Sequence, residues 1–506
     1  GERGPRERRG ARAGGEAAAP GAGGPSRPAM AEGPQGGADV PLLQGASPEG
    51  PPAPRWKLLG RGLGWLRGEG PPREGAPPRK EFGGGGGVLL IMAFSHVLPY
   101  YLLGCLEQNH GRPLGPATFA KRLPRILWHA RPTGFSVCVY LGFILVEGVL
   151  AAVMPGVVVK GRPIPPDGRQ LSYLCNGLTC WYFSLVLVTV LHFSRLLPLS
   201  SIVENYGALL TTAVLFADAV SVALYVAPLA AGSATRMTGN PLYDFFMGAA
   251  LNPRLGPVDL KMFAEIRVSW MLLFLLTLSA FKENLEHGGS CKWNLSLVLI
   301  AHGLYTNACM KGEELIPMTW DIFHEKFGFM LIFWNLAGVP FVYCFPSLYI
   351  AGNPQQVLSS PWYSGALLAV LLAAYYVWDT ANSQKNRFRA QQMGLPLRGV
   401  WAFPQLPWGT LRDPKWLDTA SGSKLLISGW WGMARKIHYT SDFVMSMVWA
   451  LACGFGSPLP YVYPVFFLVM ITHRVVRDEA RCKQKYGSDW ERYKAAVPHL
   501  FIPGVF

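Results

Sequence analysis

The sequence predicts an all-α, polytopic membrane protein with about ten transmembrane helices. Of its 506 residues, 50% are hydrophobic and only 15% are charged, which is typical of chains whose helices are surrounded by lipid. The apolar residues gather in long runs separated by polar intervals. We expect each run to form one helix that crosses the bilayer.

Charge and cysteine content argue against two classes of partner. The net charge of +15 is spread over the polar intervals and the ends of the apolar runs, so no compact basic domain is left to bind nucleic acid. The nine cysteines form no CxxC pair and show no metal-ligand spacing. We expect reduced cysteines that pack between helices, no metal and no nucleic acid.

Residues 1–87 precede the first apolar run and are rich in Gly, Pro, Ala and Arg. Such a composition lacks the apolar residues that a core requires. We therefore expect a disordered, low-complexity tail, in which the glycine run 83–87 forms a flexible hinge at the membrane.

The apolar runs divide the remaining chain into two halves, 88–290 and 291–506, both built from transmembrane helices. The expected spans are 88–105, 133–154, 171–193, 206–230, 268–281, 293–309, 327–350, 362–378, 443–455 and 461–472. Several are short, which is also typical of re-entrant segments or of segments that line a wet cavity. The polar interval 379–442 contains Pro404, Pro407 and Pro414, so we expect a structured loop with little helix there.

Segment 473–487 carries the strongest functional signal. In a helix its charged residues recur at three- and four-residue steps, so they share one face. These residues are Arg474, Arg477, Asp478, Arg481 and Lys485. A cationic face with one carboxylate, at the mouth of a membrane helix, suits a phosphorylated ligand. The alternative is a positive anchor beside lipid headgroups.

The residues that follow predict how this helix ends. Gly487 is a natural helix stop. Ser488 with Glu491 has the pattern of a capping box, which would open a second short helix at 489–496.

Two loops carry carboxylates of interest. In segment 239–254, where Gly, Pro and Asn impose turns, Asp244 and Arg254 could pair and fix a loop that acts as a structural lid or in the chemistry. Glu313 precedes the run 327–350, and a carboxyl group buried at membrane depth can hold a proton and donate it. Alternatively, Glu313 lies in a solvated loop.

Two further segments offer groups for a nucleotide. Lys385 and Arg389 are four residues apart, so they either clamp a phosphate or form the positive flank of a membrane helix. Trp431 and Tyr439 either stack on a planar ring or belong to the aromatic belt at the membrane surface. Because the chain has neither GxGxxG nor a P-loop, a nucleotide would have to bind at helix ends.

Together these segments resemble the membrane-bound sterol reductase family. Segment 239–254 is similar to the first signature of that family, and 473–487 is similar to the second, continued by Trp490, Tyr493 and Pro498. The likeness extends from about residue 88 onward. Within the family, the chain looks most like the Δ24(24¹)-sterol (C-24(28)) reductases of ergosterol and phytosterol synthesis, on segments 307–314, 320–323, 379–388 and 403–408.

The resemblance implies an NADPH-dependent enzyme of the endoplasmic reticulum membrane that reduces a sterol double bond. The half 291–506 would hold NADPH and the sterol. The positions implied to contact NADPH are Lys385, Arg389, Leu426, Trp431, His438, Tyr439, Arg474, Asp478, Cys482, Lys483, Gln484, Lys485, Tyr486 and Tyr493. His438 departs from the Asn of Δ7-reductases, and Gly312 stands where we align a Tyr of Δ14-reductases.

The implied reaction sets the roles of two carboxylates. An isolated alkene must be protonated to a tertiary cation before a hydride can quench it, in a site that excludes water. We expect Asp478 or Glu313 to be the acid or its relay. Cations around Asp478 would lower its pKa and favour an orienting role, so Glu313 is the better candidate donor.

Other functions remain open on the sequence alone. One is reduction of a Δ14 or Δ7 double bond. Another is methyl transfer by a membrane methyltransferase of the isoprenylcysteine type, which shares the Tyr-Gly…Trp…Tyr…Val-Pro pattern and needs no clamp for a 2′-phosphate. A third is a non-catalytic sterol-binding scaffold, against which the low-complexity composition of 1–87 argues.

Overall fold

The computed structural model describes residues 80–164, 168–392, 394 and 406–505, so the expected tail lies outside the described residues except for 80–87. The glycine run does not form a hinge, because helix α2 (Gly84–Asn109) begins inside it. The backbone N–H of Glu81 donates to the Tyr243 hydroxyl at 2.9 Å, and the Glu81 carboxylate pairs with Arg477 at 2.7 Å. These contacts hold the start of α2 in place.

The described residues form an all-α membrane bundle, as predicted. Seven of their helical stretches are long and apolar enough to cross a membrane, judged by length and composition. They are α2, α4 (Gly134–Val153), α7 (Tyr206–Ala230), the stretches Leu260–Glu286 and Phe329–Gly352, α16 (Pro361–Gln392) and the stretch Leu459–Tyr486. Shorter or less apolar helices occupy the three other expected spans: α5 (Gly177–Phe193), α11 (Lys292–Lys311) and α18 (Ile437–Leu451).

Two of the long stretches contain a π-helical turn. The first consists of α9 (Leu260–Met262), the π turn η2 (Phe263–Val268) and α10 (Ser269–Glu286). The second consists of α13 (Phe329–Phe333), the π turn η4 (Trp334–Gly338), α14 (Val339–Tyr343) and α15 (Phe345–Gly352). Single π turns are often found at functional sites, and η2 carries Arg267, which is important below.

Short elements connect the helices. Three antiparallel hairpins are formed by β1 (Val157–Lys160) with β2 (Ser172–Cys175), β3 (Arg254–Leu255) with β4 (Val258–Asp259), and β5 (Trp416–Asp418) with β6 (Lys424–Leu426). The short helices are α3 (Pro116–His129), α6 (Ser200–Glu204), α8 (Pro241–Met247), η3 (Glu313–Met318), α12 (Trp320–Phe323), η5 (Pro354–Gln356), α17 (Trp430–Met433), η6 (Leu459–Tyr461) and α20 (Ser488–Ala496). The last long helix is α19 (Val462–Tyr486).

Two expected boundaries were wrong for identifiable reasons. The span expected at 171–193 begins as strand β2, because these residues pair with β1. Asn176 then donates its side-chain amide to Met154 O at 2.7 Å, which satisfies the end of α4. The interval 379–442 is more helical than predicted, because α16 continues to Gln392. Its polar residues are satisfied inside the fold, as when Gln384 donates to Trp408 O at 2.9 Å.

Two local pairings also differ from the prediction. Asp244 does not pair with Arg254 but accepts hydrogen bonds from Thr238 and Gly239 in the turn before α8. The carboxylate therefore stabilises its own loop. Ser488 is not a helix cap: α20 starts at Ser488 itself after Gly487, which has φ 54° and also ends α19.

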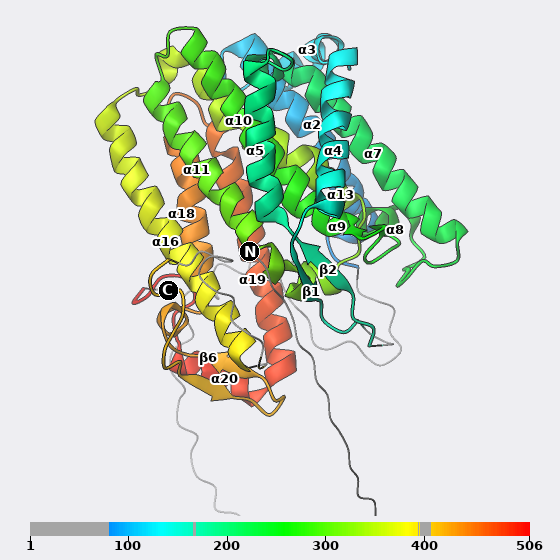
Figure 1. Cartoon of the computed structure of the whole chain (residues 1–506), viewed down its shortest axis with the longest axis vertical. Helices are drawn as coiled ribbons and strands as arrows, with labels where there is room; N and C mark the ends of the chain where they lie inside the picture. Colours follow the sequence, from blue (N-terminus) through cyan, green and yellow to red (C-terminus); the bar gives the residue numbers. More distant parts are fainter. Residues whose placement is uncertain (1–79, 165–167, 393, 395–405, 506) are drawn as a thin grey trace, which may run out of the picture. The chain divides into compact units, whose positions relative to one another are not determined.

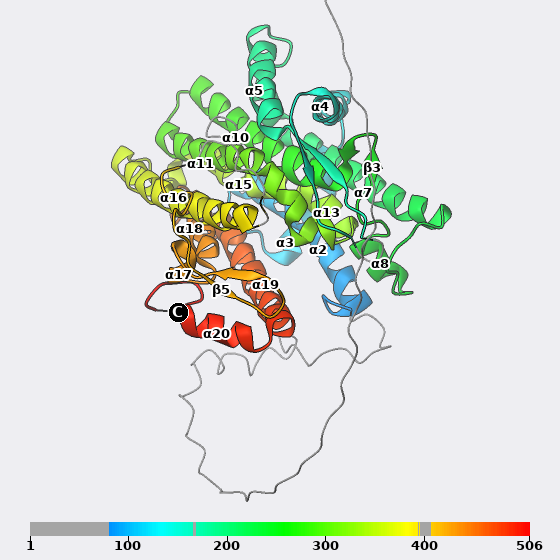
Figure 2. The ribbon, with the colours of Figure 1, turned by 60° about the horizontal axis from the view of Figure 1, so that its bottom comes forward.

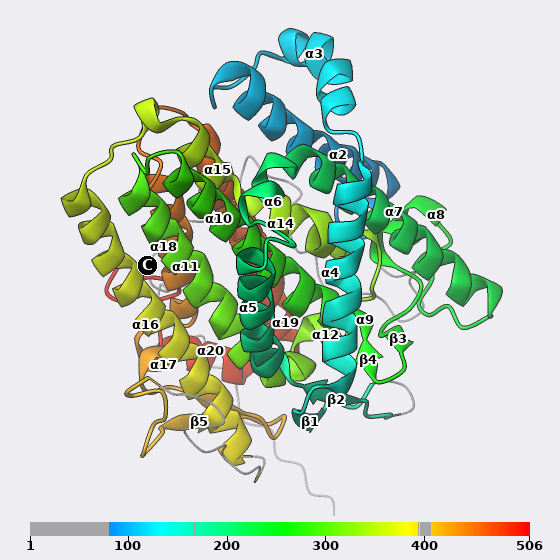
Figure 3. The ribbon, with the colours of Figure 1, turned by 45° about the horizontal axis from the view of Figure 1, so that its top comes forward.

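The helices pack in two groups that share α16. Figure 3 shows α4, α5, α11 and α16 in a row, and neighbouring members of this row pack against each other. Figures 1 and 2 show α16, α18 and α19 side by side, with β5, β6, α17 and α20 gathered at one end of these three helices. The groups predicted to bind a nucleotide lie on the elements at that end.

Candidate active site

Side chains from three elements meet where α16 and α18 pack on α17. The Lys385 ammonium lies 3.8 Å from the centroid of the Trp431 ring. The His438 ring lies 5.0 Å from Trp431 and 4.1 Å from Tyr439, centroid to centroid. The structure therefore brings together four of the residues predicted to bind the cofactor, Lys385, Trp431, His438 and Tyr439, which we call the Trp431 cluster.

Backbone geometry explains how the Trp431 cluster is held. Trp431 donates its indole N–H to Ala381 O of α16 at 2.7 Å, and the N–H of Trp430 donates to Gln384 at 3.0 Å. Gly429 has φ 62°, and a Cβ there would lie 2.4 Å from the Gln384 side-chain oxygen. Only glycine allows this close approach, so α17 is pinned to α16.

Asp478 reaches this site from α19 through an ion pair with Lys436, the residue that precedes α18. Arg474, which precedes Asp478 by one turn on the same helix, pairs with Asp321 at 3.2 Å instead. About a third of the Asp478 side chain remains accessible. Asp478 thus ties α19 to the start of α18 while remaining open to a ligand.

Most of the remaining predicted residues lie beside the Trp431 cluster. Leu426 packs with Phe388 and Trp431. Cys482, Tyr486 and Tyr493 belong to an adjacent apolar cluster around Trp490. The exposed side chains of Lys483, Gln484 and Lys485 are not brought into the cluster. The side chain of Arg389 is also exposed, one turn beyond Lys385 on α16.

The basic face of α19 is partly neutralised by acids from other segments. Arg477 pairs with Glu81 at 2.7 Å and lies 3.6 Å from Glu325. The guanidinium of Arg481 lies 3.6 Å above the Trp320 ring. Trp320 in turn donates its indole N–H to Glu325 at 2.7 Å. The segment 320–326 is therefore fastened to the helix that carries Asp478.

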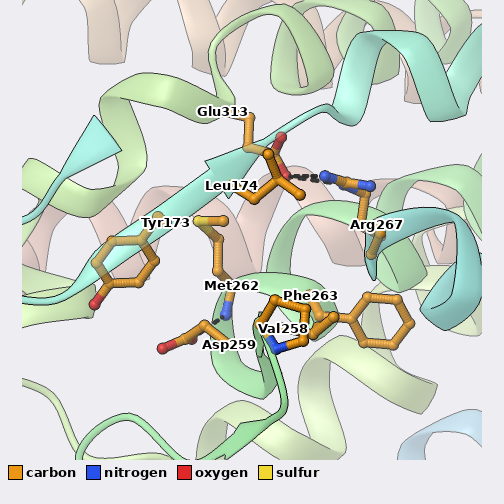
Figure 4. Close-up of a pocket in the computed structure, with 10 residues that line it drawn as sticks. Tyr173, Leu174, Val258, Asp259, Met262, Phe263, Arg267 and Glu313 are labelled. Atoms are coloured by element: carbon orange, nitrogen blue, oxygen red, sulfur yellow. Dashed lines mark hydrogen bonds and ion pairs between the residues drawn. The ribbon is translucent and has the colours of Figure 1, made fainter. Parts of the chain in front are cut away.

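Glu313 has a different environment from the one that the sequence suggested. Its carboxylate is buried and accepts hydrogen bonds from Arg267 at 2.6 and 2.8 Å and from the Gly177 N–H at 2.7 Å. Figure 4 shows this ion pair beside a cavity of about 20 Å³, which has room for roughly one water molecule. This ion pair favours the ionised carboxylate, so Glu313 does not suit the role of proton donor.

The structure adds a carboxyl group that the sequence reading missed. Asp442 lies one turn after His438 on α18, and its carboxyl group is close to Tyr305 of α11 and Trp378 of α16. A carboxyl group next to an apolar run is often functional, so the sequence offered a sign of this residue. Its place at the end of the polar interval 379–442 indicated a loop residue instead.

Among the described residues, no three His, Cys, Asp or Glu side chains are grouped as a metal site would require. The site consists of cations, aromatic rings and a few carboxylates at helix ends. Such an arrangement can bind a phosphorylated ligand with a planar ring. The half-buried Asp442 adds a group that can exchange a proton.

Comparison with known proteins agrees with these features. The sequence model of the "Ergosterol biosynthesis ERG4/ERG24 family" matches residues 78–506. The chain is 44% identical over 436 residues to the "Delta(24(24(1)))-sterol reductase erg4A" of Aspergillus fumigatus, covering 84% of this chain and 92% of that protein. It is 42% identical over 455 residues to the "Delta(24(24(1)))-sterol reductase" of Gibberella zeae, covering 87% of this chain and 75% of that protein.

A more distant relative extends the comparison. The "Delta(14)-sterol reductase" of Methylotuvimicrobium alcaliphilum is 34% identical over 430 residues, covering 85% of this chain and 96% of that protein. The match of one family model to the whole membrane bundle, together with these identities, shows that the chain belongs to the ergosterol biosynthesis ERG4/ERG24 family of sterol reductases.

Proposed function

We propose that this protein is an NADPH-dependent reductase of the endoplasmic reticulum membrane that reduces the Δ24(24¹) side-chain double bond of a sterol. The observation that carries the proposal is the Trp431 cluster, which holds a cation against an indole face beside the Lys436–Asp478 ion pair. The choice among sterol double bonds is supported by the names of the two relatives at 44% and 42% identity.

The residues present fit a phosphorylated dinucleotide. Lys385 rests on Trp431 rather than on a carboxylate, and Arg389 follows one turn later on the same helix. His438 Nδ1 is buried and has no hydrogen-bond partner among the described residues, and a buried polar atom of this kind needs a partner. When bound, the cofactor would supply the hydride.

The chain itself must supply the proton, and we assign this role to Asp442 with Tyr305. The neighbours of Asp442 are a phenol and an indole, whereas Glu313 faces a guanidinium. A carboxyl group among uncharged neighbours in a bundle interior is costly to ionise. In the proposed step, the proton leaves the Asp442–Tyr305 pair for the terminal alkene carbon, and the cation left on C24 accepts the hydride. Solvent then returns a proton to the pair.

Asp478 and the apolar packing have supporting roles in this proposal. Asp478 orients Lys436 and, through it, the start of α18, which carries His438 and Asp442. The interlocked helices would keep water from trapping the cation.

The proposal is tested by expressing the chain in a yeast strain that lacks its own Δ24(24¹)-sterol reductase and analysing the sterols. We expect the Δ24(24¹)-unsaturated sterol to disappear and its reduced product to form, and a Lys385→Ala variant to be much less effective. A parallel strain lacking Δ14 reduction tests the activity named for the more distant relative. Rescue of that strain alone would overturn the assigned double bond. A tagged protein that does not coincide with an endoplasmic reticulum marker would overturn the assigned location.

A further inference from the structure

The arginines around the ends of α16 and α19 fall into two groups. Those of the first group face carboxylates: Arg474 faces Asp321, and Arg477 faces Glu81. In the second group, Arg162, Arg389 and Arg481 have no carboxylate partner among the described residues. Arginines of the first group stabilise the fold through ion pairs, whereas those of the second keep guanidinium N–H donors available for a ligand.

Two of the unpaired arginines are held by one pair of aromatic rings. Trp320 and Phe323 of α12 lie 5.5 Å apart, centroid to centroid, in an edge-to-face arrangement. The Arg481 guanidinium lies 3.6 Å from the centroid of Trp320, and that of Arg162 lies 5.1 Å from the centroid of Phe323. An aromatic face supports a guanidinium without using its N–H donors. Both cations can therefore still bind an anion.

The third unpaired arginine approaches the same place from α16. Arg389 carries its positive charge near the C-terminal end of that helix, close enough to Arg162 for the two charges to repel each other. Figures 1 and 3 show the β1–β2 hairpin and the C-terminal end of α16 toward the same end of the bundle. Like charges gathered in this way favour a bound anion between them.

The position of Arg162 is set by the hairpin that leads to it. The N–H of Gly161 donates to Leu171 O at 2.8 Å, and a Cβ on Gly161 would lie 2.9 Å from the Tyr173 ring and 3.5 Å from Pro317 O. The backbone just before Arg162 is therefore packed against η3. Arg162 belongs to an ordered part of the fold, from a region of the sequence that was not expected to contribute to the cofactor site.

We propose that Arg162 completes a phosphate-binding site with Arg389 and Arg481, and that its ligand is the phosphate monoester of the cofactor. This inference rests on the proposed function and adds a specificity residue from outside the half 291–506. Guanidinium groups suit a dianionic phosphate, because each can offer parallel N–H donors to its oxygens. In NADPH the monoester is the 2′-phosphate, which NADH lacks.

The test measures NADPH and NADH dissociation constants of purified Arg162→Gln protein in detergent, after a thermal melt has confirmed its fold. We expect the NADPH dissociation constant to rise roughly tenfold and that of NADH to stay nearly unchanged. The fragment 2′,5′-ADP, which carries the monoester without the nicotinamide, should lose competition with NADPH to the same extent. The control is Arg169→Gln, which removes one positive charge from the same hairpin and should leave NADPH binding unchanged.

The outcomes separate this inference from the proposed function. If Arg389→Gln weakens NADPH binding but Arg162→Gln does not, Arg162 is outside the site and the proposed function stands. Equal losses for NADPH and NADH would make Arg162 a structural residue and also overturn the inference. If the Arg162→Gln protein binds NADPH normally but binds more weakly to vesicles rich in phosphatidic acid, the phosphate is that of a lipid headgroup. If both Arg389→Gln and Lys385→Ala bind NADPH normally, the proposed cofactor is wrong as well.

Discussion

The ammonium group of Lys385 lies over the indole ring of Trp431, at 3.8 Å from its centroid. The two residues come from α16 and α17, which are joined by the hydrogen bond from the Trp431 indole to Ala381 O. Because the partner of the ammonium group is a π face and not a carboxylate, its charge is not cancelled in place. Lys385 is therefore prepared for a second, anionic partner.

Lys385→Ala and Arg389→Ala should each weaken NADPH binding far more than NADH binding. Each charge-assisted contact with a phosphate contributes roughly 1.5–3 kcal/mol. Titration of both nucleotides into purified protein measures the difference. Lys424→Ala is the matched control, because Lys424 lies over Trp416 at 4.6 Å but outside the Trp431 cluster. Equal losses for the two nucleotides would leave Lys385 and Arg389 as anchors at the membrane surface.

Asp478→Asn should impair both NADPH binding and turnover while leaving the protein folded. The change releases Lys436 from its ion pair and loosens the link between α19 and the start of α18. Binding and single-turnover measurements on the same preparation separate the two effects. Glu491→Gln, which removes an exposed ion pair with Lys494, should change neither. Normal NADPH affinity without turnover would instead identify Asp478 as the acid.

Glu313→Gln should make the folded protein less stable. It leaves Arg267 buried without a counter-charge, and breaking a buried ion pair in this way costs about 3–5 kcal/mol. We expect a clearly lower melting temperature in detergent. The double variant Arg267→Met/Glu313→Leu should recover part of the loss, since neither charge is then left alone. A Glu313→Gln protein of normal stability that lacks turnover would restore Glu313 as the donor.

Asp442→Asn and Tyr305→Phe should reduce turnover with little change in NADPH affinity. Removing a general acid lowers the rate by about 10²–10⁴-fold. Quenched single turnovers with bound sterol measure this rate directly. Ser446→Ala is the control one turn further along α18, because Ser446 bonds only to the backbone, at Phe443 O. Full activity of both variants would exclude the pair as the proton source.

His324 should make the protein less stable as the pH falls. Burial, reinforced by the positive charge of Arg236, lowers the pKa of His324 from 6.5 to about 4. Between these values the unfolded chain binds a proton that the folded chain does not, so stability is lost as the pH falls from 6.5 toward 4. Melting temperatures of wild type and His324→Gln should converge in this window. His110→Gln, at an exposed turn, should follow the wild type.

The helices were predictable where one physical signal decides the structure. The run 206–230 is mostly apolar, with Asp218 as its one charged residue, and forms α7 with the predicted bounds. The extension of α16 was not predictable, because Ser383 and Gln384 look like loop residues. The helix continues through them, and the Gln384 side chain is satisfied by Trp408 O and by the N–H of Trp430.

The candidate site also has one part that the sequence predicts and another that only the fold reveals. Lys385 and Arg389 could be placed on one helix face from their spacing alone. The partners of Asp478 and Glu313 could not, because Lys436 lies 42 residues from Asp478 and Arg267 lies 46 residues from Glu313. The likeness to known enzymes identified the residues around Trp431, but only the fold revealed the contact between Asp442 and Tyr305.

The ion pair between Glu81 and Arg477 has a consequence for how the protein is made. Its two residues are separated by about 400 residues of sequence, which a ribosome takes roughly 20–80 s to synthesise. During that time the entry to α2 lacks its partner on α19. We expect a ribosome-bound nascent chain arrested before α19 to be cut by protease near Glu81, and the completed chain to resist. The start of α2 thus gains this ion pair only when α19, the last long helix, has been inserted.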